Sequence, residues 1–155
     1  MKRYGPLIAV PDALAVGDPG RNHLRLTPDA VILREGVDNR GIVPWSSVES
    51  ILLDVPTTRF RLPGLVGTIV LGALTAVALS DLGVDPDDGA VTLTVDGEST
   101  TVPLSRHHVG GYWEPTVMGA HRLLAHLIEN PEQRALLAHP EPLIDIAAQL
   151  ARESV

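Results

Sequence analysis

The chain has 155 residues, of which 45% are hydrophobic and 3% aromatic, and its formal net charge is −7 at pH 7. This length fits one ordinary domain, and the apolar content is enough for an aliphatic core, which excludes a wholly disordered chain. The lack of cysteine excludes disulfides, thiolate catalysis and cysteine-bound metals, and the acidic charge disfavours nucleic-acid binding.

Residues 1–22 contain several glycines and prolines that interrupt two short apolar runs, Leu7–Val10 and Ala13–Val16. We predict an extended N-terminal arm with one or two short strands, and the alternative is a mobile tail. The basic start resembles a signal peptide only weakly, because prolines break the apolar run, so we interpret it as mature protein.

The segment 23–35 predicts a β-hairpin. Apolar and polar residues alternate over 23–26, Thr27–Ala30 fits a turn with proline at its second position, and Ala30–Leu33 resumes as a strand. Gly36–Gly41 is expected to be a polar loop or a second turn.

Residues 42–55 follow. Pro44 cannot donate to a central ladder, so we expect Ile42-Val43 to end a strand. A further strand is predicted to begin near Val48 and to run toward Val55. A short helix is the alternative, because the apolar residues of this stretch also fit helical spacing.

Leu62–Ser80 is an apolar run of nineteen residues without a charge. It is long enough for a single membrane span, and Arg59 and Arg61 before it would place the N-terminal side in the cytoplasm. A single span would, however, separate the first and last predicted hairpins across a bilayer. We therefore expect an apolar insertion over 62–84 that stays with the fold, as a buried helix or a strand pair. The aspartates that follow lack the spacing of a calcium loop and indicate a solvated loop.

Residues 91–104 predict a second hairpin around Asp96-Gly97, the preferred two-residue type I′ turn. Counting across the turn pairs Val95 with Glu98, Leu93 with Thr100 and Val91 with Val102. Threonines then occupy the solvent-facing side of the hairpin, and the apolar face consists of Val91, Leu93, Val95, Val102 and Leu104. Pro103 places the return strand at an edge or ends it.

The rest of the chain predicts helices. Pro115 suits the first turn of a helix that continues to about residue 129, a short helical turn follows over 131–138, and Pro142 opens the last helix. The expected apolar face of the first helix is Val117, Ala120, Leu124, Leu127 and Ile128, and that of the last helix is Leu143, Ile146, Ala147 and Leu150.

One set of residues matches a known pattern: Leu26, Thr27, Asp29, Arg34, Gly36, Val43, Pro44, Trp45 and Val48. With these residues the chain resembles the bacterial, actinobacterial-type pleckstrin-homology-like (PH-like) domains, over residues 23–56 in motif and over 91–129 in the order of elements. The resemblance implies an α+β fold with a PH-like antiparallel sheet or partly open barrel, an apolar insertion and C-terminal helices. It also implies structural roles for Pro44 and Trp45, with Trp45 in the core or at the barrel end. The apolar run at 62–80 departs from the family pattern.

On this basis we expect three parts: the arm (1–22), a PH-like domain (23–130) and a C-terminal helical extension (131–155). Family members with a known role mostly bind lipids, peptides or protein partners, but fold alone does not transfer function.

Two groups of side chains are candidates for a functional site, one for a ligand or partner and one for a metal. Arg106, His107, His108, Tyr112, Trp113 and Glu114 could line a ligand or partner mouth on a loop that Gly110-Gly111 allows to bend. The alternative is that Trp113 packs at the helix start while the histidines are solvated. His107, His108 and His121 with Glu114 are zinc-ligand types, but their spacing matches no zinc motif and a packed histidine is the ordinary explanation for His121. We therefore predict no metal and no cofactor.

Catalytic signatures are weak, because the serines lack a nucleophile-elbow setting and the glycines lack phosphate-loop spacing. We predict a non-catalytic, cytoplasmic binding module whose partner is an unknown protein or a second copy met through apolar surface. Two alternatives stay open: a membrane-anchored protein with a span at 62–80, and an enzyme or metal-binding protein with a His/Glu site around 107–121.

Overall fold

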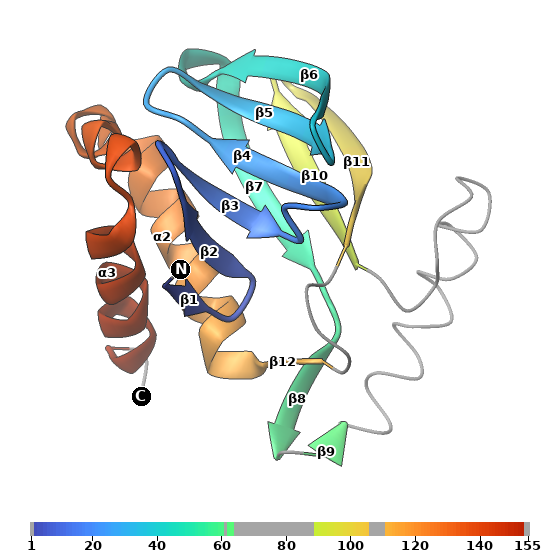
Figure 1. The fold of residues 1–155 in the computed structure, drawn as a ribbon, viewed down its shortest axis with the longest axis vertical. Coiled ribbons are helices and arrows are strands. Elements are labelled where there is room, and N and C mark those ends of the chain that lie inside the picture. The colour runs from blue at the N-terminus through green and yellow to red at the C-terminus, as the bar shows by residue number, and fades with distance from the viewer. Residues whose placement is uncertain (1, 61, 64–88, 106–110, 154–155) are drawn as a thin grey trace.

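The computed structural model describes residues 2–60, 62–63, 89–105 and 111–153. The described chain is an α+β fold in which antiparallel sheets precede the C-terminal helices (Figure 1). The largest sheet has six strands in chain order, each antiparallel to its neighbours: β1 (Arg3–Tyr4), β2 (Leu7–Val10), β3 (Ala13–Gly17), β4 (Asn22–Leu26), β5 (Ala30–Glu35) and β6 (Asp38–Pro44).

A 3₁₀ turn, η1 (Trp45–Ser47), leads from β6 into the second sheet. This sheet has the order β11-β10-β7 and consists of β7 (Val48–Asp54), β10 (Gly89–Val95) and β11 (Glu98–Leu104). A small third sheet joins β8 (Thr57–Phe60), β9 (Leu62–Pro63) and β12 (Tyr112–Trp113). The chain ends in α2 (Glu114–Glu129), the 3₁₀ helix η2 (Pro131–Ala138) and α3 (Glu141–Arg152).

Both predicted hairpins are confirmed. In the β4–β5 hairpin, the Thr27 N–H donates to the Ala30 carbonyl at 3.0 Å and the Ala30 N–H donates to Thr27 Oγ1 at 3.1 Å. In the β10–β11 hairpin, the predicted register is the observed one, with Val95 opposite Glu98. Asp96 and Gly97 have φ values of 50° and 82°, as a type I′ turn requires.

The strand predicted to begin near Val48 is confirmed as β7, so the helical alternative is wrong there. The helices at the C-terminal end also follow the prediction, but the buried face of α3 differs from the expected one. Ile144 and Ala151 are buried, whereas Ile146 and Leu150 are only partly buried.

The N-terminal segment contributes β1, β2 and β3 to the main sheet. Leu7 and Leu14 are fully buried and belong to the same hydrophobic cluster as the buried side chains of α2 and α3, so the mobile-tail alternative is wrong. Leu143 of α3 belongs to this cluster too. One core therefore extends across the expected boundaries at residues 22 and 130.

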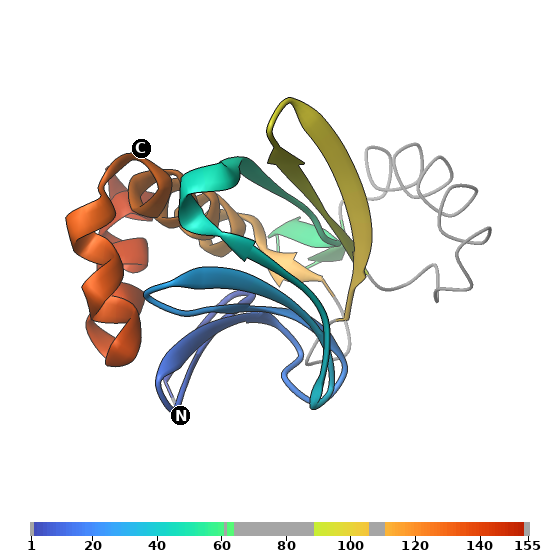
Figure 2. The ribbon, with the colours of Figure 1, turned by 90° about the horizontal axis from the view of Figure 1, so that it is seen from above.

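Figure 2 shows the six-stranded sheet curving along one side of the core, the β7–β10–β11 sheet along another, and the helices covering a third side. Within the described residues the sheets do not form one closed barrel. At one corner the Ser105 N–H donates to the Asn22 carbonyl at 2.9 Å, and the Asp18 N–H donates to the Ser105 carbonyl at 2.8 Å. At the other corner the buried Trp45 donates its indole N–H to the Thr27 carbonyl at 2.7 Å.

The apolar run at Leu62–Ser80 lies outside the described residues except for Leu62–Pro63, which form β9. Its interpretation as a buried insertion or as a membrane span therefore stays a prediction. In the part of the chain that the structure describes, no helix has the length and apolar character needed to span a membrane.

Candidate functional site

The predicted ligand mouth is only partly described, because Arg106, His107 and His108 lie outside the described residues. Tyr112 is 1% exposed and belongs to the core, and its N–H donates to the Pro56 carbonyl at 2.8 Å. Trp113, the next residue, is 58% exposed. The two rings therefore do not share one surface. Glu114 follows as the first residue of α2, where a carboxylate interacts favourably with the helix dipole.

His121 lies on α2 and contacts the second sheet. Its Nε2 accepts the N–H of Leu53, on β7, at 2.8 Å. Accepting this hydrogen bond requires a neutral ring with the proton on Nδ1. Burial lowers the pKa of His121 below its ordinary value of 6.5, which favours that same neutral form.

This contact removes Nε2 of His121 from the set of available metal ligands. Among the described residues, no group of three histidine, cysteine, aspartate or glutamate side chains is arranged to hold a metal ion. His107 and His108 lie outside the described residues, so the predicted histidine set as a whole is not placed. In the described geometry His121 makes a structural contact, because its ring covers the Leu53 amide on the side of β7 that pairs with no strand.

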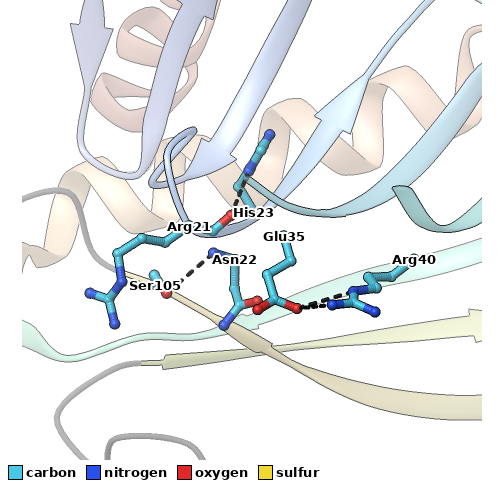
Figure 3. A network of polar contacts seen from close by, with 6 residues as sticks. All are labelled: Arg21, Asn22, His23, Glu35, Arg40 and Ser105. Atoms are coloured by element: carbon cyan, nitrogen blue, oxygen red, sulfur yellow. Dashed lines mark hydrogen bonds and ion pairs between the residues drawn. The ribbon is translucent and has the colours of Figure 1, made fainter. Parts of the chain in front are cut away.

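Polar contacts cluster where the end of β11 meets the start of β4 (Figure 3). The Asn22 N–H donates to Ser105 Oγ at 3.4 Å, and Nδ1 of His23 lies 3.1 Å from the Arg21 carbonyl. Because a carbonyl only accepts, the His23 proton sits on Nδ1. The Asn22–Ser105 contact links the two sheets at the corner, whereas the His23 contact is local to the start of β4, and both support the fold.

His23 is only 4% exposed, although it is one of the polar residues that alternate with Leu24 and Leu26 along the hairpin. Burial lowers the pKa of His23, and the guanidinium groups of Arg34 and Arg25 act in the same direction. The local sequence pattern contains no signal for this burial, because the burial arises from neighbouring strands. His23 stands opposite Gly17 of β3 and Arg34 of β5 in the sheet.

The other polar pair in Figure 3 joins Arg40 of β6 to Glu35 of β5, with Nη2 and Oε2 separated by 2.6 Å. Both side chains are more than half exposed, so the pair contributes little stability. The Arg34 guanidinium also donates to the Val37 carbonyl at 2.8 Å. Together these contacts connect β5 to β6 and to the turn between them, and so stabilise this hairpin.

The free side of β6 is the surface that best fits a binding role, and we name it the β6 edge: the unpaired side of Asp38–Pro44 together with the exposed side chains of Val37 and Ile42. β6 ends the six-stranded sheet and pairs with β5 on its other side. Val37 is 85% exposed and Ile42 is 61% exposed. An edge strand presents unpaired N–H and C=O groups to another chain, so this surface can bind an extended segment.

The sequence contained one signal for the β6 edge. Pro44 marked Ile42-Val43 as the end of a strand, and proline within sheets is confined to edges, ends and bulges. The prediction gave Gly36–Gly41 to a polar loop or a second turn, whereas the turn takes up only residues 36–37 and β6 begins at Asp38. No protein-family model, curated protein or solved structure matches this chain.

Proposed function

We propose that this chain is a non-catalytic, PH-like interaction module that associates with a second copy of itself through the β6 edge. The observation that carries the proposal is an edge strand with a 61% exposed Ile42 next to a turn with an 85% exposed Val37. Large exposed apolar side chains beside an unpaired strand are typical of a surface that another chain covers.

The order of elements supports the PH-like part of the proposal. The strand β4, the turn at Thr27–Ala30 and the strand β5 are followed by the Pro44-Trp45 segment that enters β7, and the β10–β11 hairpin precedes α2. This is the order that the sequence resemblance implies. The strands β1–β3 precede the segment that carries the resemblance, and η2 and α3 follow it.

The chemistry of β6 supports a second copy as the partner. An edge strand that pairs antiparallel with its own copy forms a symmetric contact, so one surface serves both chains. The side chains of Asp38–Pro44 include one aspartate and one arginine, so the strand has no net charge to oppose self-pairing. Pairing would bury Ile42 in each copy and remove its apolar area from water. Pro44 has no N–H to donate, which limits the paired stretch to the residues before it.

A contact of this kind is small, so we expect a weak dimer. Stable interfaces bury about 1,200–2,000 Å² in total, and one added strand pair falls at or below the lower limit of that range. Association should therefore increase with protein concentration, and a concentration series is needed to detect it.

The test is sedimentation or light scattering of the full chain across a range of concentrations, with two matched variants. Ile42→Lys places a charge on the β6 edge and should give a monomer at every concentration. Leu52→Lys changes a side chain of similar exposure, 58%, on β7 and should leave association unchanged. A wild-type chain that stays monomeric throughout, or two variants with equal effects, would overturn the proposal.

The proposal includes a cytoplasmic location. It is tested by expressing the chain without detergent and separating soluble from membrane fractions. Recovery in the soluble fraction agrees with the proposal. Recovery only in membranes would favour the membrane-anchored alternative, which depends on residues 62–80.

A further inference from the structure

A groove lies between the β2–β3 turn and the chain that joins η2 to α3. These two segments are at the end of the molecule where η2 lies in Figure 1. The volume of the groove is about 330 Å³. Pockets for small molecules and cofactors usually measure about 300–1,000 Å³. This groove is at the lower limit of that range, so its size suits a small group such as a single side chain. It is lined by Ala9, Val10, Pro11, Asp12, Ala138, His139, Pro140, Glu141 and Pro142.

The groove has few hydrogen-bond donors. Three of its lining residues are prolines, which have no N–H. The backbone N–H of His139 donates to the Leu136 carbonyl at 3.0 Å, and that of Ala9 donates to the Lys2 carbonyl at 2.9 Å. The imidazole of His139 is the remaining side-chain donor among the lining residues. The start of α3, with prolines at 140 and 142, is therefore poorly suited to bind an anion.

The acceptors are the carboxylates of Asp12 and Glu141, both exposed at the rim. A further carboxylate of α3, that of Asp145, is already paired, since its Oδ1 lies 2.6 Å from Lys2 Nζ. One cation reaches a lining residue from the sheet side: the guanidinium of Arg25 donates to the Pro11 carbonyl at 2.9 Å. The lining residues therefore carry two negative charges above a floor of buried Ala9, Val10 and Pro140.

We propose that this groove binds an arginine side chain of a partner protein. The aliphatic stem would lie against the proline rings and Val10, and the guanidinium would face Asp12 and Glu141. Arginine fits better than lysine, because its planar fork supplies several donors to a site of acceptors and its guanidinium is less strongly hydrated than an ammonium. This proposal is independent of the β6 edge, which is a separate surface.

The test is an NMR titration of the full chain with the peptide acetyl-Ala-Arg-Ala-amide. We expect concentration-dependent shifts of the Ala9, Val10 and Ala138 amide signals. The same peptide with citrulline, which keeps the shape of arginine without its charge, should produce much smaller shifts. Equal shifts from the citrulline peptide, or none from the arginine peptide, would overturn the proposal. Equal affinity for the matching lysine peptide would overturn the choice of arginine.

Matched variants locate the site. Asp12→Asn and Glu141→Gln should each weaken arginine-peptide binding about two- to fivefold, the effect expected of one exposed ion pair. Asparagine also tolerates the left-handed backbone that Asp12 adopts, with φ of 61°, so the turn should persist. Asp145→Asn is the control and should leave binding unchanged. Ile42→Lys should also leave it unchanged, which separates failure of this proposal from failure of the β6 edge.

Discussion

Two strands that follow one another in the chain have edges of opposite character. β6 ends the six-stranded sheet and β7 ends the three-stranded sheet, and only η1 separates them. The β6 edge is open and carries the exposed Ile42, whereas β7 is packed against α2, whose His121 accepts the Leu53 N–H. Whether an edge is open therefore depends on which later element reaches it.

This difference bears on function, because an unpaired edge is a route to unwanted strand pairing. The chain protects β7 with a helix from its C-terminal half. For β6 the described protection consists of a proline at the strand end and the ion pair between Arg40 and Glu35. We infer that β6 is the edge that can accept another strand, and the following experiments test the contrast from the larger expected effect to the smaller.

Removing the cover of β7 should have the largest effect. His121→Ala leaves the Leu53 N–H without its acceptor, and an unpaired buried donor costs about 1–3 kcal/mol of unfolding free energy. Urea unfolding measures the loss, and hydrogen exchange at the Leu53 amide should accelerate. His139→Ala, at an exposed position, is the control and should change the unfolding free energy by less than about 0.5 kcal/mol. Unchanged exchange at Leu53 would show that His121 does not cover this edge.

The same contact predicts a dependence on pH. The pKa values of His121 and His23 both lie below their ordinary value of 6.5 in the folded chain, chiefly because the rings are buried. The unfolded chain therefore binds more protons as the pH falls, so stability is fully present above pH 6.5 and declines below it.

Urea midpoints measured on both sides of pH 6.5 test this dependence. His121→Gln keeps a side-chain acceptor for Leu53 but cannot titrate, so its midpoint should fall less than that of the wild type on acidification. An equal fall in the two proteins would assign the whole effect to His23 and other groups, and would remove His121 from the explanation.

The sequence predicted those parts of the fold that depend on local chemistry. The Asp96-Gly97 turn determines the β10–β11 register, because a two-residue turn leaves no choice of pairing. Pro115 and helical spacing likewise located α2. Trp45 was expected in the core or at a barrel end, and it is buried with Arg134 stacked 5.0 Å from its ring.

What could not be predicted depends on contacts between distant segments. Leu7 is buried because α2 and α3 share its core, and the sequence of an N-terminal arm contains no sign of that. His23 is buried by its sheet neighbours, and His121 finds Leu53 across 68 positions of sequence. The candidate site has the same origin, because exposure of β6 follows from the absence of a covering element in the described residues. Alternation within a strand cannot reveal that absence.

The smallest effect is expected on the open edge itself. Arg40→Ala removes the ion pair with Glu35, and because both side chains are more than half exposed the unfolding free energy should fall by no more than about 1 kcal/mol. Added salt should shrink the difference between variant and wild type, since exposed charges are screened. Association should respond differently from stability. The variant strand keeps Ile42 but has a net negative charge, because the charge of Asp38 is no longer balanced by Arg40. The two copies should therefore repel one another, so that the dimer weakens at low salt and recovers at high salt. A stability loss as large as that of His121→Ala would show that Arg40 anchors the sheet, and β6 would then be a supported edge like β7.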